Sequence, residues 1–70
     1  MKNLYEILGL SPKAEFWEIR AAYRARAKEV HPDAGGSNEA FSEVVLAYEI
    51  LSDNARRERY RRAIFAPPEG

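Results

Sequence analysis

The chain has no cysteine and only one histidine among its 70 residues. Without cysteine, neither a disulfide nor a thiolate metal site can stabilise the fold. Zinc would then need mostly carboxylate ligands, which is an uncommon arrangement, so we expect no metal and no other cofactor. The sequence also lacks an apolar run long enough to span a bilayer, and its first residues lack the apolar core of a secretory signal. We therefore expect a cytoplasmic protein, or a domain of a larger one, without membrane contact.

Net charge is absent too, although positive and negative residues are unevenly distributed along the chain. Eleven basic and eleven acidic residues give a formal charge of zero and a pI of about 6.6. Nucleic-acid binders usually carry a basic excess, so we expect no nucleic-acid partner. Residues 53–65 nevertheless contain five arginines against two acidic residues. This segment is either a solvated helix face or a surface that meets an acidic protein, nucleic acid or anionic lipid.

The spacing of apolar residues predicts an all-α fold in one domain of residues 1–65. We expect helices at Leu4–Leu8, Ala14–Val30 and Asn38–Leu51. Ser52 or Asp53 can cap a fourth, short helix that runs to about Ile64, with Tyr60 and Ile64 as its candidate anchors. Asn3 can cap the first of these helices, and Gly9 suits a left-handed position at its end. The short loop between the two long helices favours an antiparallel hairpin. Residues 66–70 should form a terminal tail or the start of a linker.

Each long helix carries an apolar stripe, and we expect the two stripes to face each other and form the core. They are Phe16, Ile19, Tyr23, Ala27 and Val30 on the first long helix, and Phe41, Val44, Tyr48 and Leu51 on the second. We expect Leu4, Tyr5 and Leu8 to cover one side of this core. We expect Trp17 to be partly buried, with a partly exposed binding anchor as the alternative. We expect Leu46 to be a scattered surface residue, with a contact to another domain or to the fourth helix as the alternative.

His31-Pro32-Asp33 stands between the two long helical patterns. Proline disfavours a helical conformation in the residue before it, so the tripeptide should lie at the exposed tip of the hairpin. A histidine and an aspartate two residues apart could act as a base and its orienting group. We expect no enzyme, however, because the sequence predicts neither a pocket nor a nucleophile beside them.

A second stripe on the first long helix is basic and leads toward the tripeptide. It contains Arg20, Arg24 and Lys28. An exposed loop with hydrogen-bonding groups next to positive charge is typical of a surface that docks on an acidic partner.

Several runs of the sequence resemble the J-domain of DnaJ-type co-chaperones. They are Leu4-Tyr5-Glu6-Ile7-Leu8-Gly9, the Glu18-Ile19-Arg20-x-Ala22-Tyr23-Arg24 run, His31-Pro32-Asp33, the segment from Phe41 to Asp53, and Arg57-x-x-Tyr60. The resemblance covers Asn3 to about Arg61, which is nearly the whole chain. A lone His-Pro-Asp would be weak support, but the order and spacing of all these runs make the resemblance specific.

The resemblance implies a small four-helix J-domain, in which a long antiparallel hairpin exposes the His-Pro-Asp loop. It implies a monomeric co-chaperone module that docks on a heat-shock protein 70 chaperone and stimulates its ATP hydrolysis. The ATP belongs to that partner, because nothing in the sequence resembles a phosphate-binding loop. By position, the partner-binding residues would be His31, Pro32, Asp33, Arg20, Arg24 and Lys28.

Some positions depart from the pattern of the family. Ala25 and Ala34 stand where basic residues are usual, and the lost charge could weaken docking or tune it to a particular chaperone. A J-like scaffold or adaptor with weak or no chaperone stimulation therefore remains the alternative. Arg26 stands where a core leucine is usual, and we expect it to bury its methylenes and keep its guanidinium in water.

Overall fold

The computed structural model describes residues 2–65, and these form four α-helices and one turn of 3-10 helix. The elements are α1 (Leu4–Ile7), α2 (Phe16–Val30), η1 (Pro32–Ala34), α3 (Asn38–Leu51) and α4 (Asn54–Phe65). No strand occurs in this part of the chain. The all-α prediction is therefore confirmed, while the tail predicted for residues 66–70 lies outside the described residues.

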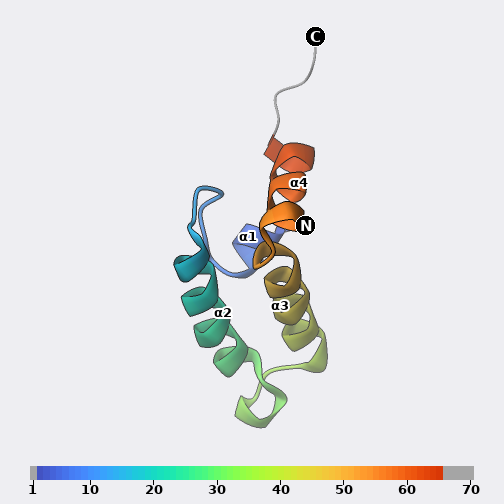
Figure 1. The fold of residues 1–70 in the computed structure, drawn as a ribbon. Helices are drawn as coiled ribbons and strands as arrows, with labels where there is room; N and C mark the ends of the chain where they lie inside the picture. The colour runs from blue at the N-terminus through green and yellow to red at the C-terminus, as the bar shows by residue number, and fades with distance from the viewer. Residues whose placement is uncertain (1, 66–70) are drawn as a thin grey trace.

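Helices α2 and α3 run antiparallel and form a hairpin, with η1 at its tip (Figure 1). Helix α1 packs against α3 near the open end of the hairpin. Helix α4 follows α3 and extends away from the tip, so it lies at the opposite end of the molecule from η1. This arrangement is the hairpin that the short loop predicted.

Local side-chain chemistry determines where the helices begin. The side chain of Asn3 accepts a hydrogen bond from the backbone N–H of Glu6, as predicted for the cap of α1. Helix α2 begins at Phe16 rather than at Ala14, because Glu15 caps it and forms a capping box with Glu18. The predicted start of this helix is thus wrong by two residues, whereas the bounds of α3 match the prediction.

The hydrophobic core lies where α1, α2 and α3 meet. Its buried members are Tyr5, Leu8, Ile19, Val44, Ala47 and Leu51. Tyr23, Ala27, Val30 and Tyr48 pack around this cluster and are only partly buried. The two predicted stripes therefore do face each other, and residues of α1 cover one side, as expected.

Two aromatic residues at the start of α2 depart from the predicted core. Phe16 is 43% exposed and Trp17 is 66% exposed, so the expected burial of both is wrong. Helical periodicity gives the angle of a side chain around its helix, but not how far the facing element extends. Phe16 has the angle of the core stripe, but it lies in the first turn of α2, and α4 packs against α3 rather than over that turn.

Helix α4 is attached mainly through Tyr60. Its hydroxyl oxygen accepts a hydrogen bond of 2.7 Å from the backbone N–H of Leu4, and its ring centroid lies 6.1 Å from that of Tyr5. Phe65 also contacts Tyr5, at 6.0 Å between ring centroids. Ile64, the other anchor considered for this helix, is 43% exposed.

Arg26 connects α2 to the end of α1. Its side chain is partly buried, and Nε donates a hydrogen bond of 3.3 Å to the carbonyl oxygen of Ile7. The guanidinium also reaches Glu29 at 3.1 Å. The prediction of a guanidinium kept in water is thus wrong in part, because one of its donors binds protein backbone.

Candidate functional site

The His-Pro-Asp turn is a compact loop held by its own backbone. His31 ends α2 in an extended conformation (φ −58°, ψ 136°), as expected for a residue before proline. Its carbonyl oxygen accepts hydrogen bonds from the N–H groups of Ala34 at 2.9 Å and Gly36 at 3.0 Å. Gly35 then reverses the chain with a φ of +88°. The chain therefore turns sharply between α2 and α3.

Gly36 lies so close to the carbonyl of Val30 that a side chain at this position would clash with the end of α2. The pattern of the sequence does not single out this glycine from the rest of the loop. The requirement for glycine at this position comes from the way the loop folds back onto α2, and this path cannot be read from the sequence.

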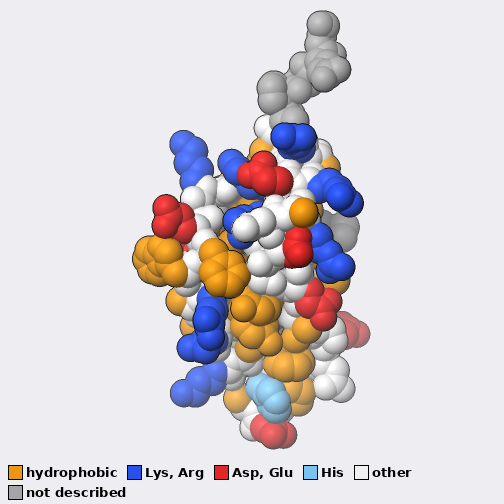
Figure 2. All heavy atoms as spheres, viewed as in Figure 1, with side chains coloured by type: hydrophobic (Ala, Val, Ile, Leu, Met, Phe, Trp, Pro, Cys, Tyr) orange, Lys and Arg blue, Asp and Glu red, His pale blue; other side chains and the backbone are white. Residues whose placement is uncertain are grey.

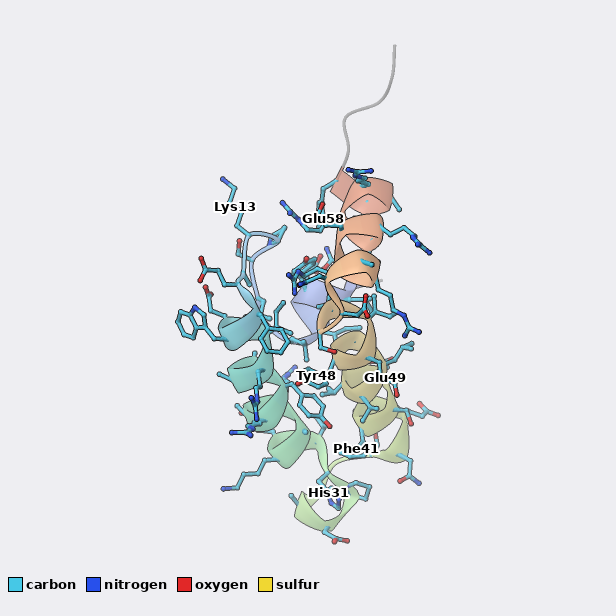
Figure 3. All side chains as sticks on the ribbon, in the orientation of Figure 1. Lys13, His31, Phe41, Tyr48, Glu49 and Glu58 are labelled. Atoms are coloured by element: carbon cyan, nitrogen blue, oxygen red, sulfur yellow. The ribbon has the colours of Figure 1, made fainter. Side chains whose placement is uncertain are left out.

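The imidazole of His31 stabilises the turn through a contact with the backbone of the turn itself. Its Nδ1 accepts a hydrogen bond of 3.1 Å from the backbone N–H of Asp33, so this nitrogen carries no proton in that arrangement. The ring also packs edge-on against Phe41, with centroids 5.1 Å apart and planes at 75°. Figure 3 shows His31 and Phe41 together at the tip of the hairpin. His31 thus links the turn to the first part of α3.

The carboxylate of Asp33 points into solvent. Its side chain is 95% exposed, and one carboxylate oxygen lies 3.8 Å from Nδ1 of His31. Among the described residues it forms no closer polar contact. This carboxylate is therefore available to a donor on another molecule.

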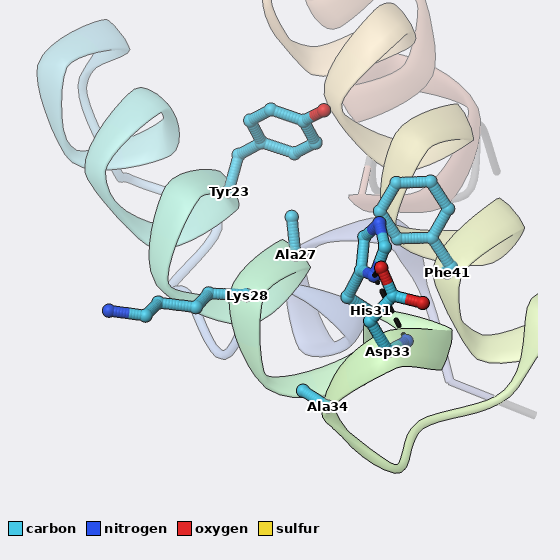
Figure 4. A pocket seen from close by; sticks show the side chains of 7 residues that line it. All are labelled: Tyr23, Ala27, Lys28, His31, Asp33, Ala34 and Phe41. Atoms are coloured by element: carbon cyan, nitrogen blue, oxygen red, sulfur yellow. Dashed lines mark hydrogen bonds and ion pairs between the residues drawn. The ribbon is translucent and has the colours of Figure 1, made fainter.

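A shallow groove runs beside the turn (Figure 4). It is lined by Tyr23, Ala27, Lys28, His31, Asp33, Ala34 and Phe41. Tyr23 stacks on Tyr48 of α3, with ring centroids 4.1 Å apart, so the aromatic wall of the groove is fixed between the two long helices. Phe41, which the apolar spacing assigned to the core, is part of this groove. Its contact with His31 depends on the path of the loop between α2 and α3, so the sequence held no sufficient signal for it.

The three basic residues predicted for the site all lie on the outer side of α2. Arg20, Arg24 and Lys28 are exposed, and none of them forms a salt bridge with another residue of the range 2–65. Figure 2 shows basic side chains over α2 that lead down toward the histidine. Lys28 lines the same groove as His31 and Asp33, whereas the two arginines lie farther from the turn and line a second shallow groove. The structure thus brings Lys28 to the triplet and leaves the arginines as a continuation along one face.

No group of three or more histidine or acidic side chains is placed to hold a metal ion in residues 2–65. No helix in the same range is long and apolar enough to cross a membrane.

Fold and site together define a class: a helical-hairpin domain that presents a His-Pro-Asp turn beside a basic helix face. The family model described as "DnaJ domain" matches residues 3–61, and the chain belongs to this family. The resemblance stated from the sequence is thereby confirmed.

Curated relatives agree with this assignment. The chain is 45% identical over 75 residues to "Chaperone protein DnaJ" of Mycoplasma mobile, with 99% of this chain and 20% of the relative covered. It is 46% identical over 67 residues to the protein of the same name in Hydrogenobacter thermophilus, covering 91% of this chain and 19% of the relative. A "DnaJ protein homolog" of Cucumis sativus is 50% identical over 56 residues, which are 80% of this chain and 14% of the relative. The chain therefore spans about a fifth or less of the length of these relatives.

Proposed function

We propose that this chain is a co-chaperone module that docks on a heat-shock protein 70 chaperone and stimulates its ATP hydrolysis. The observation that carries the proposal is the exposed carboxylate of Asp33, presented by a rigid turn beside the basic face of α2. Membership of the DnaJ domain family and relatives named as chaperone proteins support it. The same proposal makes the chain a non-enzyme, because the nucleotide and its hydrolysis belong to the partner.

Each site residue has a distinct physical role in this proposal. Asp33 accepts a charge-assisted hydrogen bond from a cationic group of the chaperone. Pro32 and the imidazole of His31 keep the turn in one conformation, which lowers the ordering cost of docking. Arg20, Arg24 and Lys28 meet an acidic surface and orient the encounter.

The stimulation itself is an allosteric effect on the partner. A bound module can only shift the chaperone toward the conformation that it binds more tightly. The module therefore has to discriminate between two states of the chaperone, and the contact through Asp33 is the one we propose for that discrimination. The basic face supplies attraction that is common to both states.

A comparison of two carboxylate variants tests the proposal. Asp33→Asn removes the charge of the turn, and a hydrogen bond to a charged group contributes about 1.5–3 kcal/mol, so chaperone affinity should fall about 10- to 150-fold. Glu49→Gln is the matched control, because Glu49 is also exposed and lies on α3 away from the turn (Figure 3). The affinity for a heat-shock protein 70 chaperone and its single-turnover ATP hydrolysis are both measured with wild type and the two variants. Equal stimulation by wild type and Asp33→Asn would refute the role of the turn.

The alternative is a J-like scaffold or adaptor domain that binds without stimulating. It is favoured by one observation: Ala34, which lines the groove beside Asp33, carries no charge where the family usually has a basic residue. The same experiment separates the two functions, because a scaffold would bind the chaperone and leave its hydrolysis rate unchanged. We further propose that the module acts as a monomer in the cytoplasm, and light scattering of the purified chain tests the oligomeric part of this proposal.

A further inference from the structure

The start of α2 exposes two neighbouring aromatic side chains. Phe16 is 43% exposed and Trp17 is 66% exposed, because no other helix of the described residues covers these two side chains in the first turn of α2. Figure 2 shows large hydrophobic side chains that protrude next to the upper part of α2. Single exposed hydrophobic residues are common, but adjoining large aromatics form a patch, and such patches mark interaction sites.

This patch is joined to charged side chains of the proposed docking face. Phe16 and Trp17 line one shallow groove together with Arg20, Ala21 and Arg24. The aromatic rings and the two arginines therefore form one surface. Trp and Arg are also the residue types most enriched at the centres of protein interfaces.

The indole of Trp17 is held in place before any partner arrives. Its Nε1–H donates a hydrogen bond of 2.9 Å to the carboxylate of Glu15, the residue that caps α2. The polar edge of the ring is thus satisfied within the chain, while the ring faces are left open. A side chain that is already oriented loses less entropy on binding, so it is a favourable anchor.

Helix geometry places Trp17 on the same face as the basic stripe. At about 100° per residue, Trp17, Arg20, Arg24 and Lys28 fall within a sector of about 80°. At about 1.5 Å per residue, Trp17 lies about 16 Å along the helix from Lys28, which lines the groove of the His-Pro-Asp turn. A partner that covers the turn and the basic stripe would therefore reach Trp17 without leaving this face.

We propose that Phe16 and Trp17 form an apolar anchor that extends the docking face to the start of α2. The occupant is the heat-shock protein 70 chaperone itself, through an apolar depression at the edge of the acidic surface that meets Arg20 and Arg24. This inference rests on the proposed function and deepens it. The patch is continuous with Arg20 and Arg24, and positive side chains on this face attract an acidic surface, which favours this occupant.

Two alanine variants test this anchor. Trp17→Ala should raise the dissociation constant for the chaperone about tenfold, and Phe16→Ala should raise it in the same direction. Leu46→Ala is the matched control, because Leu46 is also a large exposed side chain (52%) but lies on α3 in a different groove. Thermal melts check that all three variants stay folded, and Phe16→Ala should lose the most stability, since more than half of its surface is covered. An unchanged dissociation constant for both aromatic variants would overturn the proposal.

Two further measurements distinguish the contact of this anchor from the contacts of the His-Pro-Asp turn: the salt dependence of binding and a fluorine NMR signal from Trp17. The loss caused by Trp17→Ala should persist at high salt, because an apolar contact is not screened. Trp17 is the only tryptophan, so 5-fluorotryptophan gives one fluorine NMR signal, which should shift when the chaperone binds. Chaperone binding that depends on Asp33 but leaves this signal unmoved would refute the anchor and leave the proposed function standing.

Two other outcomes are equally decisive. Failure of wild type to bind any heat-shock protein 70 chaperone would remove the proposed function and this inference together. A signal that shifts with the concentration of the chain alone would assign the patch to a second copy of this chain and overturn the chaperone as its occupant.

Discussion

Two tyrosines at the junction of α1 and α4 show how different the role of the same side chain can be. Tyr5 is fully buried, and its hydroxyl has no hydrogen-bond partner among the described residues. Tyr60 is only partly buried, but its hydroxyl accepts the backbone N–H of Leu4 at 2.7 Å. The ring of Tyr5 therefore contributes packing alone, whereas Tyr60 contributes a hydrogen bond that satisfies the first turn of α1.

The unpartnered hydroxyl of Tyr5 predicts a loss of stability in alkali. Burial raises the pKa of Tyr5 above its ordinary value of 10.0, and the nearby Arg61 and Arg57 offset this only in part. The folded state therefore binds the proton of Tyr5 more tightly than the unfolded state does. The contribution of this proton to the free energy of unfolding is fully present below about pH 10 and is lost as pH rises through the folded pKa. Tyr5→Phe removes the titrating group. It should therefore match or slightly exceed wild type in stability at pH 7 and lose less stability than wild type above about pH 10.

Tyr60→Phe is the matched comparison, measured by denaturant unfolding from pH 7 to 11. It leaves the N–H of Leu4 without its partner, so it should cost about 1–3 kcal/mol already at pH 7. Parallel pH profiles for wild type and Tyr5→Phe would show that the buried hydroxyl of Tyr5 does not contribute to alkaline destabilisation.

At the scale of helices, the caps decide where each element begins. Ser37 precedes α3, and its hydroxyl oxygen accepts a hydrogen bond of 3.1 Å from the N–H of Ala40. Asp53 has the same role for α4, with a carboxylate oxygen 2.8 Å from the N–H of Arg56. Each cap satisfies one of the backbone donors that a helix leaves free at its start.

The cap of α3 gives a prediction for which a second serine of the same helix provides the control variant. Ser37→Ala should lower the free energy of unfolding by about 1 kcal/mol, because it removes the acceptor for the first turn. Ser42→Ala is the control: Ser42 is exposed within α3, where alanine favours the helix by a few tenths of a kcal/mol relative to serine. Thermal or denaturant unfolding of both variants measures the difference. Equal stability of the two variants would contradict the assigned cap.

The helices and their pairing could be predicted from the sequence because both follow from local rules. Apolar spacing gave the two long helices, and the short loop gave their antiparallel pairing. The burial of Phe16 and Trp17 could not be predicted in the same way, because it depends on how far α3 and α4 reach along α2. The position of Phe41 against His31 depends likewise on the path of the loop between α2 and α3.

For the molecule as a whole, the distribution of charge over the surface is more informative than the net charge. The formal charge is zero, yet the outer side of α2 is basic and α4 carries four more arginines than acidic residues. Exposed acidic residues on α3, namely Glu39, Glu43 and Glu49, supply part of the balancing negative charge, and acidic residues outside the three long helices supply the rest. Since exposed charges are screened beyond about 8 Å at physiological ionic strength, a partner senses the face that it touches rather than the total.

Two charge reversals with the same effect on net charge test whether location matters. Arg24→Glu changes the proposed docking face, whereas Arg59→Glu makes the equal change on α4, at the end of the molecule away from the turn (Figure 1). Arg24→Glu should slow association with the chaperone about tenfold at low salt, and the difference from wild type should shrink as salt is added. Arg59→Glu should leave the association rate near that of wild type. Stopped-flow measurements over a range of ionic strength give both rates.

The helix itself should tolerate both reversals, which makes the comparison one of docking rather than of folding. In Arg24→Glu the new carboxylate stands four residues from Arg20 and from Lys28, and opposite charges at this spacing stabilise a helix by about 0.2–0.5 kcal/mol. In Arg59→Glu it stands three residues from Arg56 and Arg62, which is also favourable. Equal slowing by both variants would mean that the chaperone senses total charge or that α4 belongs to the interface. In either case the basic face of α2 would lose its special role, and the arginines of α4 would become the next surface to map.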